Sequence, residues 1–246
     1  MRALWRWILV LVLAGLALQL FFVLRIGVAG TIAPQSTTFQ RSEVWRIYRE
    51  KDRPHWSQHW VPYERISSNL KRAVIASEDD DFVYHDGVDW EAIEKAWEKN
   101  AKAQELAAKA QLRASVRPLP QRAPKIVGGS TITQQLAKNL LLSGERTMLR
   151  KGQEFVLAYL LELLLTKERI LEIYLNSIEW GEGVFGAEAA AQHYWRKHAS
   201  ELTPYEAARL AVMLPRPRYF EKVPNSGYLS NRALTIVARM RHAELP

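Results

Sequence analysis

An acidic cluster in the first half of the chain holds residue types that are suited to acid–base chemistry. Four consecutive carboxylates run from Glu78 to Asp81, and Phe82, His85 and Gly87 follow at short spacings. A carboxylate with a suitable pKa can take the proton of an attacking hydroxyl group. Taken alone, the cluster is more typical of a solvated acidic turn. A catalytic interpretation therefore needs support from elsewhere in the chain.

A glycine-led helix start is the second candidate. Residues 128–139 read GGSTITQQLAKN. A glycine-rich turn that opens onto a helix N-terminus offers free N–H groups and the positive end of the helix dipole to an anion. Gln134 lies four residues before Lys138 and Gln135 lies three before it, so each amide shares a helix face with the ammonium group. The alternative is a well-capped surface helix without a ligand.

A third stretch adds positive charge through Arg146, Arg150 and Lys151, followed by Glu154. Arg150 and Glu154 are four residues apart, which fits a single helical salt bridge worth about 0.3–0.5 kcal/mol. The functional alternative is a cationic wall beside a second carboxylate.

The elements that must position these residues begin with an apolar segment. No charged residue occurs in the 18 residues from Trp7 to Leu24. A helix of that length measures roughly 27 Å, close to the hydrocarbon thickness of a bilayer. Arg2 and Arg6 precede it, so we orient the N-terminus toward the cytoplasm. A cleaved signal peptide is the alternative, but the run exceeds a usual signal core. We expect a retained anchor.

Helix signals dominate the remaining sequence. Thr131 and Gln134 form a capping-box pattern that predicts a helix through about Leu142. Residues 158–165 are apolar nearly all round, which fits either a core helix or a surface on the bilayer. Few segments alternate with a strand period, so the predicted class is mainly α. The expected segments are a cytoplasmic N-terminus and anchor at 1–25, a juxtamembrane lead-in at 26–65, and a catalytic domain at 66–246 with an extended segment at about 100–125.

The composition excludes several classes of function. The chain has 246 residues, a formal net charge of +8 and no cysteine, which excludes disulfides, thiolate metal sites and thiol nucleophiles. The positive charge favours an anionic partner. No zinc finger, RNP motif or convincing helix-turn-helix occurs, so nucleic acid is not expected. Residues 181–186 match GxGxxG, but they follow a helical segment in an α-rich chain, which argues against a dinucleotide site.

Four motifs occur in a fixed order, and together they point to a family. They are Glu-Asp-x-x-Phe-x-x-His-x-Gly at 78–87, Gly-Gly-Ser-Thr-Ile-Thr-Gln-Gln-x-x-Lys-Asn at 128–139, Arg-Lys-x-x-Glu at 150–154 and Ile-Leu-Glu-x-Tyr-Leu-Asn at 170–176. This pattern resembles the peptidoglycan glycosyltransferases of family 51, in particular their monofunctional Gram-negative branch without a transpeptidase domain. The resemblance runs from about residue 40 to the end. The longer connection at 100–125 departs from the family pattern.

The resemblance implies a lysozyme-like glycosyltransferase domain behind one transmembrane helix. In the implied reaction, the 4-hydroxyl of lipid II attacks C1 of a lipid-linked glycan strand, forms a β-1,4 bond and releases polyprenyl diphosphate. Glu78 is the implied base, and Glu154 lies on the diphosphate side, where it orients cations or a divalent ion. No organic cofactor and no metal ligand is assigned, and Mg or Mn stays an open option. The implied substrate-binding residues are Asp79, Phe82, His85, Thr131, Gln134, Gln135, Lys138, Asn139, Arg146, Arg150 and Lys151.

The same resemblance implies a single-pass protein of the inner membrane whose catalytic domain lies in the periplasm, with cell-wall synthesis proteins as further partners. Two rival functions stay open. A membrane-anchored glycoside hydrolase of lysozyme-like fold would need an acid for a poor sugar leaving group, commonly with a second carboxylate across the bond. It would have less use for the cations at 138–151. A non-catalytic envelope scaffold that binds glycan or partner proteins is the other.

Overall fold

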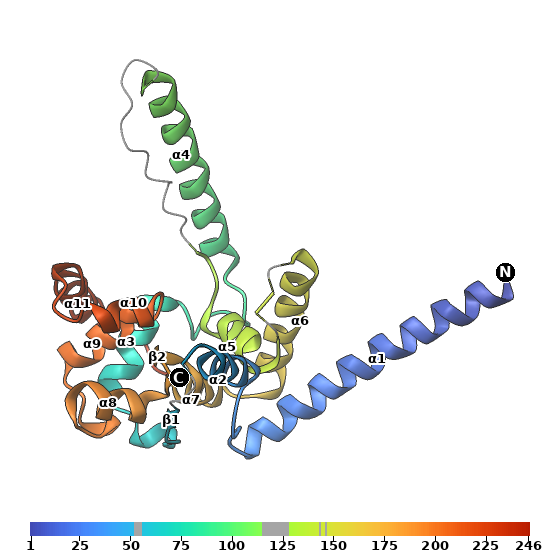
Figure 1. Cartoon of the computed structure of the whole chain (residues 1–246), viewed down its shortest axis with the longest axis horizontal. Coiled ribbons are helices and arrows are strands. Elements are labelled where there is room, and N and C mark those ends of the chain that lie inside the picture. Colours follow the sequence, from blue (N-terminus) through green and yellow to red (C-terminus); the bar gives the residue numbers. More distant parts are fainter. Residues whose placement is uncertain (52–55, 115–127, 143, 146) are drawn as a thin grey trace.

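The computed structural model describes residues 1–51, 56–114, 128–142, 144–145 and 147–246, and it is mainly helical (Figure 1), which confirms the predicted class. The α-helices are α1 (Arg2–Thr31), α2 (Thr38–Lys51), α3 (Ser68–Glu78), α4 (Trp90–Ala114), α5 (Ile132–Leu141), α6 (Met148–Leu164), α7 (Lys167–Ser177), α8 (Ala187–Trp195), α9 (Pro204–Met213), α10 (Pro217–Lys222) and α11 (Gly227–Arg239). Two short 3₁₀ turns are η1 (Tyr63–Arg65) and η2 (Ala199–Glu201).

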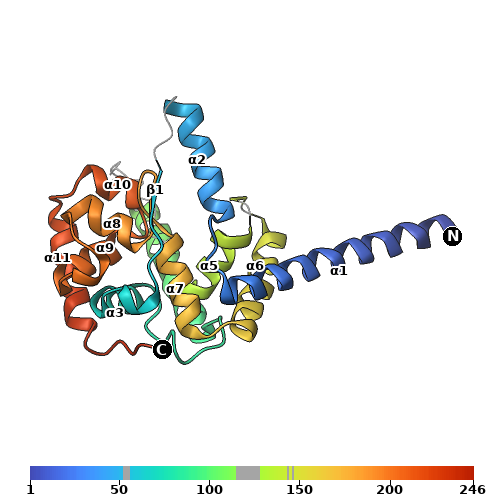
Figure 2. The same ribbon diagram turned by 90° about the horizontal axis from the view of Figure 1, so that it is seen from below.

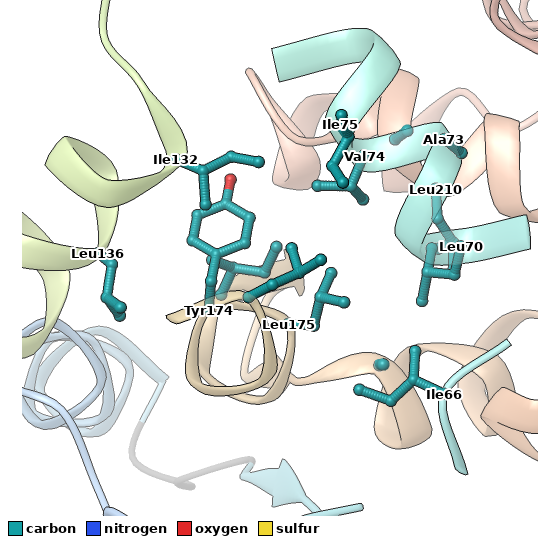
Figure 3. Packing of buried hydrophobic residues seen from close by; sticks show 14 of the residues in the cluster. Ile66, Leu70, Ala73, Val74, Ile75, Ile132, Leu136, Tyr174, Leu175 and Leu210 are labelled. Carbon is teal, nitrogen blue, oxygen red and sulfur yellow. The ribbon is translucent and has the colours of Figure 1, made fainter. Parts of the chain in front are cut away.

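Helix α7 lies at the centre of the hydrophobic core. Its residues from Ile173 to Ser177 are all buried. Figure 3 shows Tyr174 and Leu175 of α7 between Ile132 of α5 and Leu70 of α3. Helix α3 packs in turn against α9 and α11, and α5 packs against α2, α6 and α7. The core thus holds α3 and α5 on opposite sides of one buried helix.

A local capping signal sets the start of α5 where the sequence predicts it. The hydroxyl of Thr131 accepts a hydrogen bond from Gln134 N at 3.1 Å, and Thr131 N donates to Gln134 Oε1 at 3.1 Å, so the capping box is present. Thr203 caps α9 in the same way. Helices α2, α8 and α10 were not predicted, because these segments are short or too polar to show a clear apolar period.

The glycine motif at 181–186 forms a hairpin and not a nucleotide-binding loop. Strands β2 (Glu179–Gly181) and β3 (Val184–Phe185) pair antiparallel, and β1 (Ser57–Gln58) pairs parallel with β3. Gly186 has a φ of +85°, and a Cβ there would lie 2.7 Å from Asn176 O. Only glycine fits this close approach to the end of α7. The motif is therefore the tight turn of a small hairpin that packs against the end of α7.

Helix α1 is the one described helix that is long and apolar enough to cross a membrane. It continues to Thr31, beyond the expected boundary at residue 25, and its C-terminal half packs against α6. Gln19, which interrupts the apolar run, exchanges two hydrogen bonds of 3.1 Å with Gln153 of α6. Figures 1 and 2 show α1 projecting from the side of the body where α6 lies. Helix α1 therefore packs against α6, the helix that carries Glu154.

Two further sequence expectations have mixed outcomes. In the apolar stretch 158–165, Ala158 and Leu161 lie in the core, which confirms a core helix for one face, whereas Tyr159 and Leu163 are exposed, and contact of that face with a bilayer stays a prediction. The helix of the extended segment ends at Ala114 and projects from the body (Figure 1). The rest of that extension, 115–127, lies outside the described residues.

Candidate active site

Glu78 is the last residue of α3 and lines a hollow of about 260 Å³. Ser67 caps the start of α3 by accepting from Asn69 N, and Asp79 N donates to Ile75 O at the end of the helix. The carboxylate is therefore fixed at a helix end and not on a mobile acidic turn. Described charged residues that line the same hollow are Asp79, Asp80, Asp81, Asp89, Lys95 and Arg239.

The surroundings of Glu78 make it a stronger base than an exposed glutamate. Burial raises the pKa of its carboxyl group, and a hydrogen bond from Gln135 opposes that rise. Nearby Asp79 raises the pKa further, and Lys138 lowers it. Gln135 Nε2 donates to Glu78 Oε2 at 3.0 Å. A carboxylate whose pKa is raised in this way is suited to take a proton near neutral pH.

Asp79 joins the end of α3 to the start of α5. Its Oδ2 accepts from Ile132 N at 2.8 Å, and its Oδ1 accepts from His85 Nε2 at 2.9 Å. Gly87 N donates to His85 Nδ1 at 3.1 Å, so the ring proton of neutral His85 lies on Nε2. Thr131 Oγ1 donates to Gly87 O at 2.6 Å. These bonds hold the acidic loop against the first turn of α5.

Several residues expected to bind substrate are occupied by this framework. Phe82 is fully buried, and Gln134 is buried with Oε1 bound to the backbone of Thr131. Phe82, His85 and Gln134 are not among the described residues that line either hollow. Asp79 and Thr131 touch the smaller hollow, but their polar side-chain atoms are bonded within the protein. Direct substrate contact by these five residues stays a prediction.

A larger cleft of about 750 Å³ adjoins the hollow of Glu78, and Ser130 lines both. It brings together most of the remaining expected residues: Gln135, Lys138, Asn139, Arg150, Lys151 and Glu154. Arg146 lies outside the described residues. Apolar side chains share the cleft wall, namely Phe39, Leu142, Met148, Ile178 and Leu214. The cleft can therefore hold a ligand with both an anionic group and an apolar part.

Glu154 is buried on α6 between two cations. Arg150 Nη1 lies 2.9 Å from Glu154 Oε2, and Lys151 Nζ lies 2.5 Å from Oε1. The predicted salt bridge is present, and so is the cationic wall that was its alternative. Two other carboxylates lie on the described cleft wall. Glu145 is exposed, and Glu179 is buried and paired with Arg218.

Lys138 forms no ion pair with any residue in the described part of the chain. Lys138 lies on the cleft wall with part of its side chain open to solvent, and partial desolvation lowers the pKa of its ammonium group. Glu154 raises that pKa, whereas Arg150 and Lys151 lower it further. An ammonium group without a carboxylate partner is available for an anionic ligand in the cleft.

Glu154 does not fit the role of a metal ligand. Both of its oxygens accept from cations, and Lys138 adds a third positive charge nearby. Among the described residues, no group of three or more His, Asp or Glu side chains is arranged to hold a metal ion. Participation of Mg or Mn in the reaction stays a prediction.

Tyr174 is a site residue that the sequence analysis quoted in a motif without giving it a role. It lines the larger cleft and its hydroxyl contacts Gln135. Its position in the fourth motif was the available signal, but only the packing of α7 against α5 brings it to Glu78. Phe39, Ser130 and Leu214 also line the cleft and were not predicted.

A partly buried carboxylate beside a cationic, partly apolar cleft is the arrangement expected of an enzyme that transfers a group from an anionic, lipid-like donor. Comparison with known proteins gives the family. The model of the family described as transglycosylase matches residues 46–241. The chain belongs to this family, which confirms the resemblance in the sequence and the lysozyme-like class of the domain.

The similar curated proteins carry the name biosynthetic peptidoglycan transglycosylase. The protein of Herminiimonas arsenicoxydans is 49% identical, and the match covers 97% of this chain and 95% of that protein. The protein of Janthinobacterium sp. (strain Marseille) is also 49% identical, over 100% and 99% of the two chains. A Bordetella pertussis protein is 52% identical over 87% of this chain and 82% of its own. The similarity thus extends over nearly the whole chain.

The framework role of Asp79 predicts a loss of stability when it is removed. Asp79→Ala leaves Ile132 N and His85 without their partner, which should lower the free energy of unfolding by about 2–3 kcal/mol. Asp80→Ala is the matched control, since Asp80 is exposed and its pair with Arg239 is worth at most about 1 kcal/mol. Denaturant unfolding in detergent micelles measures both. Equal losses in the two variants would contradict the framework role.

Proposed function

We propose that this peptidoglycan glycosyltransferase polymerises lipid II into β-1,4-linked glycan strands and releases polyprenyl diphosphate. One observation carries the proposal: the 3.0 Å hydrogen bond from Gln135 to Glu78 joins a partly buried carboxylate to the cleft that contains Lys138 and the cations of α6. The names of the similar proteins support the substrate class. An enzyme of this kind needs a base beside the attacking hydroxyl group and an anion site beside the leaving diphosphate.

Glu78 accepts the proton of the acceptor's 4-hydroxyl as that oxygen attacks C1 of the donor. The new C1–O bond forms while the bond from C1 to the diphosphate oxygen breaks, and its electron pair leaves with the diphosphate. Attack from the face opposite the leaving group converts the α link into a β link. Lys138, Arg150 and Lys151 stabilise the charge that grows on the diphosphate. A diphosphate leaves without a proton donor, so one base is sufficient.

The cleft fits a lipid diphosphate because charged and apolar groups lie on the same wall. Met148 is exposed at the start of α6, two residues before Arg150. Leu142 and Phe39 line the cleft as well. A phosphate held by the cations would leave the polyprenyl chain against these apolar side chains. Binding of the lipid and of the diphosphate would then reinforce each other.

Membrane attachment places this cleft near its substrates. Helix α1 serves as a single-pass anchor in the inner membrane, and the catalytic domain lies in the periplasm. Gln153 supplies hydrogen bonds to Gln19, a polar group that lipid could not satisfy. Other cell-wall synthesis proteins at this location are the expected partners. Exposed apolar side chains of α6 that would meet the bilayer are Met148, Leu149, Val156, Tyr159 and Leu163.

The charges argue against the rival hydrolase. A hydrolase would need a carboxylic acid to protonate the sugar leaving group. Glu154 is the buried carboxylate of the neighbouring cleft, but Arg150 and Lys151 contact both of its oxygens, so neither oxygen is free to face a sugar leaving group. Glu154 instead holds the cations in place for the diphosphate.

Replacement of the base tests the proposal. Purified protein in detergent should convert lipid II into long glycan strands, and Glu78→Gln should lower that rate at least about 100-fold because the amide cannot accept the proton. Glu64→Gln is the control, since Glu64 is exposed in the η1 turn. Strand length is followed by gel separation of labelled lipid II products.

The other outcomes separate the rival functions. Cleavage of preformed glycan without strand growth would identify a hydrolase. Glycan binding without either reaction would identify a scaffold. Polymerisation by Glu78→Gln within a few fold of the wild-type rate would refute Glu78 as the base.

The membrane orientation has its own test, which the lack of cysteine makes clean. Asn225→Cys lies in the exposed loop between α10 and α11, and Ala3→Cys lies at the start of α1. A membrane-impermeant maleimide should label Asn225→Cys in spheroplasts and should label Ala3→Cys only after the membrane is broken. The reverse pattern would overturn the periplasmic assignment.

A further inference from the structure

Tyr174 reaches Glu78 through a single amide group. Tyr174 Oη donates to Gln135 Oε1 at 2.9 Å, and Gln135 Nε2 donates to Glu78 Oε2 at 3.0 Å. We propose that Tyr174 is a positioning residue that fixes the amide of Gln135 and thereby orients Glu78 and keeps it ionised. This inference rests on the proposed function, in which Glu78 is the base.

The chemistry of the three groups allows one arrangement of the amide. An ionised carboxylate can only accept hydrogen bonds, so the NH₂ group of Gln135 must face Glu78. The carbonyl oxygen of Gln135 must then face Tyr174, whose hydroxyl group supplies the proton. Without this hydroxyl, nothing in the chain of bonds prevents the amide from turning its oxygen toward Glu78. Two facing acceptors would then repel each other.

The packing of α7 holds Tyr174 rigidly in this role. Its side chain is almost fully buried, and Figure 3 shows its ring rising from α7 toward Ile132 with the hydroxyl group away from the helix. Burial raises the pKa of the Tyr174 phenol well above its ordinary value, and Glu78 and Asp79 raise it further. Tyr174 therefore stays protonated at any pH where the enzyme works, and its hydroxyl group donates a hydrogen bond to Gln135.

The hydrogen bond from Gln135 opposes the effect of burial on Glu78. Desolvation raises the pKa of the Glu78 carboxyl group, and the Gln135 bond lowers it. If the amide turns, this lowering is lost and the pKa of Glu78 rises. A general base must be ionised, so activity would then begin to fall at a higher pH than in the wild type.

Other charged groups also face Glu78, and the test must leave them in place. They come from the loop after α3, from α4, from α5 and from α11. They are Asp79, Asp80, Asp81, Asp89, Lys95, Lys138 and Arg239. Since Tyr174→Phe removes one oxygen atom and no charge, a change in pH dependence reports on the chain through Gln135.

The matched control is Tyr194→Phe. Tyr194 is also a tyrosine whose hydroxyl donates internally, at 2.7 Å to Trp180 O, but it is not among the described residues that line either hollow and has no hydrogen bond to Gln135 or Glu78. Tyr174→Phe should lower kcat about tenfold and move the acidic limb of kcat/KM upward by about one pH unit. KM for lipid II should stay within about twofold, because the substrate contacts remain. Tyr194→Phe should leave the pH profile unchanged.

A double-mutant cycle separates positioning from a loss of packing. In a Gln135→Leu background, the amide is absent, so Tyr174→Phe should cause no further loss of kcat. A structural role would give the same loss in both backgrounds. The position of the acidic limb does not depend on the folded fraction, so it stays informative even if Tyr174→Phe lowers the melting temperature.

The outcomes distinguish this inference from the proposed function. If the wild-type protein does not polymerise lipid II, the proposed function and the inference both fail. If the wild-type protein polymerises lipid II and Tyr174→Phe keeps the wild-type acidic limb, only the inference fails. An equal loss of kcat in both backgrounds of the cycle would also overturn it.

Discussion

The hydrogen bonds of Asp79 are the interaction on which the active site depends. Asp79 ends α3 directly after Glu78, and its carboxylate binds Ile132 N at the start of α5. It thereby sets Glu78, at the end of α3, beside Gln135 and Lys138 of α5. A buried carboxylate is unfavourable unless its oxygens are satisfied, and here a backbone N–H and His85 satisfy them. The same two helices rest on α7, so the distance between base and cations follows from the core.

The charges of the site divide between two adjoining hollows. Partial burial of Glu78 strengthens it as a base, whereas the cations line the larger cleft beside it. Glu154 reduces the repulsion between these cations, because its buried carboxylate lies between Arg150 and Lys151. Lys138 remains without an ion pair in the described part of the chain. The division matches a reaction in which a proton is removed at one atom while negative charge appears at another.

Much of this arrangement could be predicted from the sequence, because its signals are local. Thr131 marks the start of α5 through capping, and the four motifs contain the described cations and amide groups of the cleft wall. What the sequence could not supply is the role of each residue. Asp79 and Phe82 belong to motifs and look like ligands, yet their contacts lie within the fold. The bond between Gln19 and Gln153 joins positions 134 residues apart, and no local pattern predicts it.

The central claim is that cations bind the diphosphate while Glu78 acts elsewhere in the same reaction. Binding of polyprenyl diphosphate to the detergent-solubilised protein tests it without any catalytic step. Lys138→Met should weaken binding about tenfold or more, because a charge-assisted hydrogen bond is lost. Glu78→Gln should bind as tightly as the wild type, and so should Lys222→Met, whose lysine is exposed on α10. Equal affinity of Lys138→Met and the wild type would contradict the account.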